Sequence, residues 1–237
     1  MDSVVNSLVG VLQPLAVSRH LSLLPLSTLL DNLVSVEVAP ALGATVLLPS
    51  LSETGIGYGG IDIQRMLACI DRYSPESLLL VPELLRVLVA SVAKGWRAPA
   101  NLKFIAVGGA SVSAELLTAA HAVGLPAYEG YGLSECASVV ALNSPAAALK
   151  GSVGRVLPHA RIRIDAAGEI HVRGATMSGY LGNDEQTQTE VATGDLGFID
   201  ADGFFHVRGR RKNLLITSLG RNVSPEWVER ELLASDS

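Results

Sequence analysis

The chain has 237 residues, of which 49% are hydrophobic and 17% charged, so apolar burial offsets the entropy of folding and intrinsic disorder is excluded. Its formal net charge of -5 and its lack of a long basic run exclude non-specific nucleic-acid binding, which depends on many phosphate contacts. Cys69 and Cys136 are too few for a disulfide framework or a zinc site, and we expect a reducing, cytoplasmic setting.

The amino-terminal stretch is apolar, but its charges are not those of a targeting segment. Asp2 stands where a signal peptide carries positive charge. The apolar stretch over 21–50 is interrupted by Asp31, Glu37 and Pro40 before it reaches the uncharged length of a membrane span. We therefore expect neither export nor a membrane span from these segments, and we interpret 21–50 as buried protein interior.

Helical and strand patterns alternate from Val4 to about Leu125. The predicted elements are an amphipathic helix with Val4, Val5, Leu8 and Leu12 on one face, strands over 45–49, 77–82 and 103–109, and helices over 62–73 and 83–95. Gly95 is the expected carboxyl-terminal cap of its helix, and 52–60 is expected to be a flexible loop. Strands separated by helices predict an α/β fold with a mostly parallel sheet flanked by helices on both faces.

The pattern changes after about Lys150. Residues 151–157, 160–174 and 194–210 alternate between apolar and polar positions and are joined by turn sequences such as AAG and ADG. They predict a small β-barrel-like subdomain. The last segment is predicted to form a strand, a turn and a helix that Ser224 caps and Pro225 begins.

Four stretches concentrate the chemistry, and together they carry a resemblance. They are VGGAS (107–111), GYGLSE (130–135), TGDLG (193–197) and GRRKN (209–213). In this order they resemble the adenylate-forming, AMP-binding superfamily of acyl-CoA and aryl-CoA synthetases, luciferases and peptide-synthetase adenylation domains, and acyl-CoA synthetases most. The resemblance implies three regions: an α/β subdomain over 1–149 with the adenine and acyl side of the site, the small β subdomain over 150–208, and over 209–237 a hinge and the start of a carboxyl-terminal domain.

The first two motifs offer a nucleotide its ring and phosphate contacts. Gly109 and Ala110 at a strand end let the backbone approach a ligand above the sheet, although for this motif alone an ordinary strand-to-helix turn capped by Ser113 is the favoured interpretation. Tyr131 offers a face to a purine ring, and the flanking Gly130 and Gly132 remove side chains that would block it. A tight turn with a half-buried tyrosine is the plainer interpretation.

Two residues of GYGLSE are predicted to act on the phosphate. Ser134 carries a hydroxyl that can bond a phosphate oxygen, and Glu135 can serve Mg²⁺, a hard cation that takes oxygen ligands. The resemblance thus implies ATP or AMP and Mg²⁺ as cofactors and, for the full-length family, coenzyme A as co-substrate.

The resemblance also assigns the last two motifs. Asp195, expected in a rigid glycine-containing turn, would accept hydrogen bonds from a ribose diol, and Arg210 would contact the ribose and phosphates with its planar, multi-donor group. Lys212 falls at the hinge between the adenylating and thioester-forming poses. Common turn aspartates and a solvated basic turn are the alternatives.

Lysines set an expectation about catalysis. The family uses one lysine in a Ser/Thr/Gly-rich phosphate loop ahead of the region seen here and another far along its carboxyl-terminal domain, whereas the lysines of this chain lie between Lys94 and Lys212. Adenylyl transfer depends on stabilising charge on the phosphate oxygens. We therefore expect the 237-residue chain to retain the adenosine and acyl side of the site but to adenylate poorly.

Two other classes of function remain open. Ser134, Asp195 and His206 follow the chain order of an α/β-hydrolase triad, although a cysteine replaces the last glycine of the nucleophile elbow. A non-catalytic module could bind a nucleotide, an acyl-adenylate, a second copy or a partner chain. The expected acyl-pocket residues are Leu26, Thr28, Leu133, Ser138 and Val139, for a fatty or aryl acid. The histidines at 20, 121, 159, 171 and 206 lack metal-ligand spacing.

Overall fold

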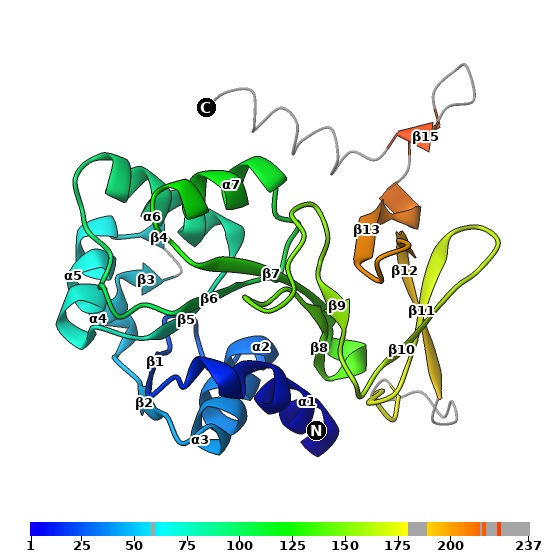
Figure 1. Ribbon diagram of the computed structural model, residues 1–237, viewed down its shortest axis with the longest axis horizontal. Helices are drawn as coiled ribbons and strands as arrows, with labels where there is room; N and C mark the ends of the chain where they lie inside the picture. Colours follow the sequence, from blue (N-terminus) through cyan, green and yellow to red (C-terminus); the bar gives the residue numbers. More distant parts are fainter. Residues whose placement is uncertain (58–59, 180–188, 214, 217–221, 224–237) are drawn as a thin grey trace.

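A seven-stranded sheet forms the centre of the protein, as the ribbon in Figure 1 shows. The computed structural model describes residues 1–57, 60–179, 189–213, 215–216 and 222–223. The strand order is β2 (Thr45–Leu47), β1 (Arg19–Leu21), β5 (Ser77–Leu80), β6 (Phe104–Val107), β7 (Ala127–Leu133), β8 (Ser138–Leu142) and β9 (Arg155–Val156). The strands from β2 to β7 are parallel, and β8 and β9 join them antiparallel.

Helices cover both faces of this sheet (Figure 1). On one face lie α1 (Asp2–Leu12), the 3-10 turn η1 (Gln13–Leu15), α2 (Leu29–Asn32), the π-helix η2 (Leu33–Val38) and α3 (Ala39–Ala41), and on the other α5 (Ile63–Tyr73), α6 (Pro82–Ala93) and α7 (Ala114–Ala122). Alternation along the strands serves both layers. In β5, Leu78 and Leu80 belong to the core under α5, α6 and α7, whereas Ser77 and Leu79 face the layer of α1 and η2. The α/β prediction is confirmed.

Local signals place the helix ends. The Asp62 side chain caps α5 by accepting from Arg65 N at 3.1 Å, and Ser113 caps α7 by accepting from Leu116 N at 3.1 Å. Pro82 occupies the first turn of α6, where its missing N–H costs no hydrogen bond. The carboxyl-terminal cap of α6 is Lys94, one residue before the predicted Gly95, which takes φ +102 at the next position.

The loop predicted over 52–60 is wrong for most of its length. Leu51–Thr54 form the short helix α4, and β3 (Ile56–Gly57) pairs with β4 (Gly60–Ile61), while Tyr58 and Gly59 lie outside the described residues. The reason is a capping box, in which Ser50 and Glu53 satisfy each other's backbone N–H groups and start a helix where the composition indicates a loop.

The second sheet is antiparallel and contains the short strands predicted after Lys150. Its order is β10 (Arg161–Ile164), β11 (Glu169–Arg173), β12 (Glu190–Ile199) and β13 (Phe205–Arg210). Asp165 and Asp200 close the AAG and ADG turns by accepting backbone N–H bonds of 2.8 to 3.0 Å. Within the predicted β subdomain, β9 pairs with β8 of the large sheet.

The remaining described elements are short. They are η3 (Ser134–Cys136), η4 (Arg211–Asn213) and the pair β14 (Leu215–Ile216) and β15 (Asn222–Val223). The helix predicted from Ser224 and Pro225 lies outside the described residues.

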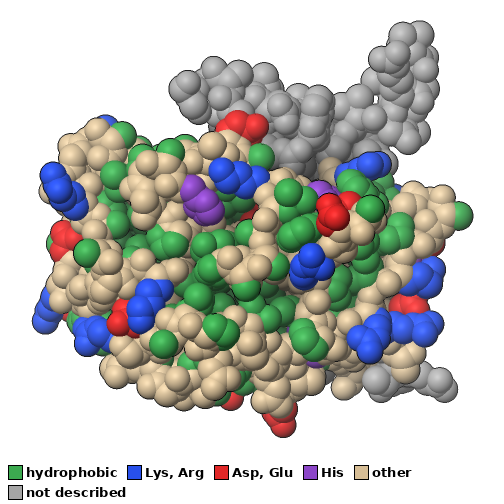
Figure 2. Space-filling model, viewed as in Figure 1, with side chains coloured by type: hydrophobic (Ala, Val, Ile, Leu, Met, Phe, Trp, Pro, Cys, Tyr) green, Lys and Arg blue, Asp and Glu red, His purple; other side chains and the backbone are tan. Residues whose placement is uncertain are grey.

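Three further observations concern the cysteines, the length of the helices and the distribution of side chains on the surface. Cys69 and Cys136 are free and buried. None of the helices built by the described residues combines the length and the apolar composition that a bilayer crossing requires. Figure 2 shows hydrophobic side chains grouped in the middle of one face, with most Lys and Arg side chains nearer its left and right margins.

Burial of His20 in β1 predicts a pH dependence of stability. The imidazole is 2% exposed, and burial lowers its pKa from 6.5 to about 4. Between these values the unfolded chain binds a proton that the folded chain does not, so the free energy of unfolding should fall by about 3 kcal/mol as the pH drops from 7 to 4. His20→Phe should remove this part of the slope in urea unfolding.

Two comparisons make the result specific. Burial raises the pKa of Asp31, which acts in the opposite direction but equally in wild type and variant, so their difference isolates His20. The same substitution at the exposed His121 should leave the slope in place. An unchanged slope in His20→Phe would contradict the assignment.

Candidate functional site

A cavity of about 420 Å³ lies between the carboxyl ends of β6 and β7 and the edge of the second sheet. Open α/β sheets place their ligands at the carboxyl ends of the strands. Seven of the residues predicted for nucleotide binding line this cavity: Gly109, Ala110, Gly130, Tyr131, Gly132, Asp195 and Arg210. The structure thus brings residues of all four motifs together at one cavity.

Asp195 stands at the centre of this group. Its side chain is 10% exposed; Oδ2 accepts from the Tyr131 hydroxyl at 2.6 Å and Oδ1 from Arg210 Nε at 3.2 Å. Burial, and then the charge of Asp195, raise the pKa of Tyr131, so the phenol stays a donor. A carboxylate has about four lone-pair positions. Asp195 can therefore accept further bonds from a ligand without losing these partners.

The predicted turn around Asp195 is wrong in form. Asp195 lies inside the long strand β12, directly opposite Arg210 of β13. The strand continues because its residues pair with both β11 and β13, while Gly194 alone takes a left-handed φ of +73. Arg210 is 65% exposed, so solvent screens its ion pair, which contributes little to stability.

The neighbouring strand requires glycine at Gly132 and packs tightly against Gly130. A Cβ on Gly132 would lie 1.5 Å from the Ser138 carbonyl oxygen, and one on Gly130 would lie 3.1 Å from that of Ala141. Pairing of β7 with β8 shifts register at Tyr131, and Ala137 and Ser138 adopt φ +52 and +86, left-handed conformations that are costly for residues with a side chain. Such strain often accompanies a binding site.

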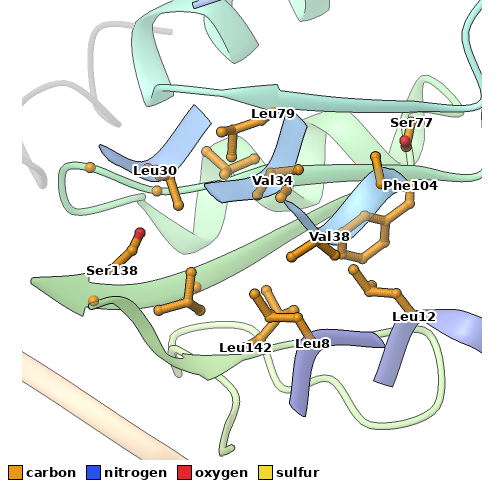
Figure 3. Close-up of a pocket in the computed structure, with 18 of the residues that line it drawn as sticks. Leu8, Leu12, Leu30, Val34, Val38, Ser77, Leu79, Phe104, Ser138 and Leu142 are labelled. Atoms are coloured by element: carbon orange, nitrogen blue, oxygen red, sulfur yellow. The ribbon is translucent and has the colours of Figure 1, made fainter. Parts of the chain in front are cut away.

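A second, apolar cavity of about 330 Å³ lies between the large sheet and the layer of α1, α2 and η2 (Figure 3). Of the expected acyl-pocket residues, Thr28, Leu133, Ser138 and Val139 line it, whereas Leu26 does not and is 38% exposed. Four residues line both cavities, and we call them the shared wall: Gly109, Gly130, Tyr131 and Gly132. A ligand with one polar and one apolar half fits this arrangement.

The predicted phosphate, metal and hinge residues lie outside the polar cavity. Ser134 lines the apolar cavity, while Glu135 is half-buried in η3, with its backbone oxygen accepting from Met177 N at 2.8 Å. Lys212 is exposed in η4. A single carboxylate suits Mg²⁺ when nucleotide phosphates supply further oxygens, so Glu135 fits the donor chemistry of that ion.

The structure gathers one group that the spacing of the histidines does not reveal. Ligand atoms of Asp165, Glu169 and His171 lie within 4.8 Å of one another on the second sheet. Glu169 also bonds Arg211, and His171 also lies 3.3 Å from Glu190. These protein partners account for the arrangement.

The hydrolase triad does not assemble in the part of the chain that the structure describes. The Asp195 carboxylate is held by Tyr131 and Arg210. His206 uses Nε2 on Asp200 at 2.8 Å and Nδ1 on the Gly151 carbonyl oxygen at 3.1 Å. A base held by Asp195 is therefore not available to Ser134.

Sequence reasoning missed several residues that line the cavities. Arg208, Glu115 and Glu129 line the polar cavity, and His20 and Ser77 line the apolar one. A signal existed for Arg208, because residues two apart on a strand share a face and Arg210 was already assigned. Glu129 is buried and accepts from Val112 N at 3.3 Å, a contact that no local pattern predicts.

Curated relatives share this sequence in part. The long-chain-fatty-acid–CoA ligase FadD15 of Mycobacterium bovis is 40% identical over 141 residues, covering 56% of this chain and 23% of that protein. The indoleacetate–CoA ligase of Aromatoleum aromaticum is 31% identical over 218 residues, covering 83% and 40%.

Solved structures share the fold. The O-succinylbenzoate coenzyme A synthetase MenE of Bacillus subtilis, in complex with AMP, matches with a TM-score of 0.78 at 26% identity, covering 98% of this chain and 50% of that one. The chain spans at most half of the length of each of these relatives. Residues 2–181 match the family described as AMP-binding enzyme. Because that match takes in most of the sequence and the predicted motifs meet at one cavity, the chain belongs to the family of AMP-binding enzymes.

Proposed function

We propose that this chain carries the adenosine and acyl side of an ATP-dependent carboxylic acid–CoA ligase site, and that it binds a fatty or aryl acid as its acyl-adenylate. The observation that carries the proposal is that a polar cavity and an apolar cavity adjoin at the shared wall of Gly109, Gly130, Tyr131 and Gly132. An acyl-adenylate has these two halves, joined at a single carbonyl.

The polar cavity supplies what the adenosine half needs. Asp195 keeps lone pairs free for ribose hydroxyls while Tyr131 and Arg210 fix its position. Tyr131 lines the same cavity and offers an aromatic face to adenine. Arg210 adds a guanidinium group, which suits phosphate oxygens, and Arg208 also lines the cavity.

The apolar cavity supports an acid of moderate size. Its volume of about 330 Å³ lies at the low end of the range for ligand pockets. The names of the relatives cover a fatty acid, indoleacetate and O-succinylbenzoate, so both fatty and aryl acids are compatible with the fold.

The remaining assignments complete the proposal. Glu135 would hold Mg²⁺ together with the phosphates, Ser134 would contact a phosphate oxygen, and Lys212 would lie at the hinge. Coenzyme A would be the co-substrate of the whole enzyme. A cytoplasmic setting, the domain boundaries and binding to a second copy or partner chain stay predictions.

The first prediction concerns binding without catalysis. Isothermal titration with a non-hydrolysable acyl-sulfamoyl adenosine should give micromolar or tighter binding, because both halves of the ligand have a cavity. A folded sample with no detectable heat would overturn the proposal and favour a partner-binding module.

The second prediction concerns Asp195. Asp195→Asn keeps the size of the side chain but removes the charge that strengthens its ribose hydrogen bonds, so AMP should bind about tenfold more weakly. Asp202→Asn makes the same change at an exposed position of the β12–β13 turn and should leave AMP affinity unchanged. Equal affinities of the two variants would contradict the role of Asp195.

The third prediction concerns catalysis by this chain alone. With the lysines expected from the family absent from its sequence, ATP-dependent formation of acyl-adenylate by the 237-residue chain should be slow or undetectable. Pyrophosphate release in the presence of acid, ATP and Mg²⁺ measures it. Rapid release that depends on the acid would refute this expectation while supporting the ligand assignment.

A further inference from the structure

The far end of the apolar cavity is polar. His20, Ser77 and Phe104 lie side by side on β1, β5 and β6, because His20 pairs with Ser77 and Ser77 with Phe104 in the sheet register. All of them line the cavity. They stand at the amino ends of the parallel strands, whereas the wall shared with the polar cavity stands at the carboxyl ends.

The histidine and the serine form a buried pair. His20 Nδ1 lies 2.8 Å from Ser77 Oγ, and the imidazole is 2% exposed. The other ring nitrogen, Nε2, is also buried and has no hydrogen-bond partner among the described residues. A buried polar atom without a partner costs folding free energy, so its retention beside a cavity calls for an explanation.

Apolar side chains separate this pair from the shared wall. Figure 3 shows the hydroxyls of Ser77 and Ser138 at opposite ends of the pocket, with Leu79, Val34 and Val38 between them. Val34 and Val38 come from the π-helix η2, a rare element that often occurs at functional sites.

The strand register gives the depth of the cavity. The residue steps from Phe104 to Val107 in β6 span about 10 Å at the rise of a parallel strand. An extended chain of roughly nine atoms covers this length, since three backbone atoms span about 3.3 to 3.6 Å. An acyl chain of that size would reach from the shared wall to His20 and Ser77.

We propose that the acyl cavity selects acids that carry an uncharged hydrogen-bonding group, such as a hydroxyl or a carbonyl, at the end remote from the carboxylate. The His20 and Ser77 pair would bind that group. The proposal rests on the function proposed above and narrows its substrate class from fatty or aryl acids in general to polar-ended ones.

The chemistry of His20 and Ser77 decides which terminal groups of the acid are favoured. A neutral imidazole beside a hydroxyl offers one donor or one acceptor according to its tautomer, so it can serve either a hydroxyl or a carbonyl. Burial lowers the pKa of His20 to about 4, so the ring is uncharged at neutral pH. It therefore provides no positive charge to compensate a buried carboxylate, and acids with a second carboxylate are disfavoured.

The test compares ligands of matched length. Acyl-sulfamoyl adenosines with nonanoyl, ω-hydroxyoctanoyl and ω-carboxyheptanoyl chains differ only in the terminal group: methyl, hydroxyl or carboxylate. By isothermal titration, wild type should bind the hydroxyl ligand with an affinity about tenfold higher than that for the methyl ligand. This ratio is the effect expected of one buried hydrogen bond to an otherwise unpaired group. The carboxylate ligand should bind most weakly.

Variants locate the effect. The double variant His20→Phe, Ser77→Ala replaces both polar partners with apolar groups, which is the change a buried pair tolerates best, and it should prefer the methyl ligand. Ser77→Ala alone should reduce the preference for hydroxyl. Ser91→Ala makes the same change at an equally buried position of α6 that lines neither cavity, and it should leave the ratio between the two ligands unchanged. Thermal melting of each variant confirms that it is folded.

The outcomes separate this inference from the function on which it rests. If wild type binds sulfamoyl adenosine and the acyl ligands but prefers the methyl or the carboxylate ligand, the inference is wrong and the proposed function stands. If none of these compounds binds to folded protein, both fail. A preference for hydroxyl that survives in the folded double variant would also overturn the role of His20 and Ser77.

Discussion

The close approach of β7 and β8 at Gly132 is the constraint on which the site depends. No side chain fits there, because a Cβ would meet the Ser138 carbonyl oxygen at 1.5 Å. The register shift between Tyr131 and Gly132 and the left-handed backbone of Ala137 and Ser138 lie at this approach. Next to this approach, Tyr131 donates to Asp195 and also lines the apolar cavity.

The two cavities have opposite character because different layers build them. The polar one lies where strand ends of the large sheet meet β12 and β13, which supply Asp195 and Arg210 from paired positions. The apolar one lies between the sheet and the layer of α1 and η2, where alternation in β5 and β6 turns Leu79 and Phe104 toward those helices. A ligand with one polar and one apolar half therefore fits where these layers meet.

Local patterns predicted the features that local forces decide. The apolar runs over 77–82 and 103–109 indicated buried parallel strands, whereas Asp195, Tyr131 and Arg210 were grouped only through the resemblance of their motifs to the adenylate-forming family. The antiparallel return of β8 was not predictable, because it needs Ser138 at φ +86, which no propensity favours. Nor was the pairing of His20 with Ser77, since residues 57 positions apart meet only through the register of β1 and β5. The helix α4 was missed although its capping box is visible in the sequence.

The central claim is that one ligand occupies both cavities, with its two halves meeting at the shared wall. A crystal structure of the chain with a nonanoyl or ω-hydroxyoctanoyl sulfamoyl adenosine tests it most directly. We expect the ribose hydroxyls within hydrogen-bond distance of the Asp195 carboxylate, the sulfamoyl group beside Gly109 and Gly130, and the acyl chain beneath η2 with its end at Ser77. A ligand lying wholly in one cavity, or with its acyl chain in solvent, would contradict the account.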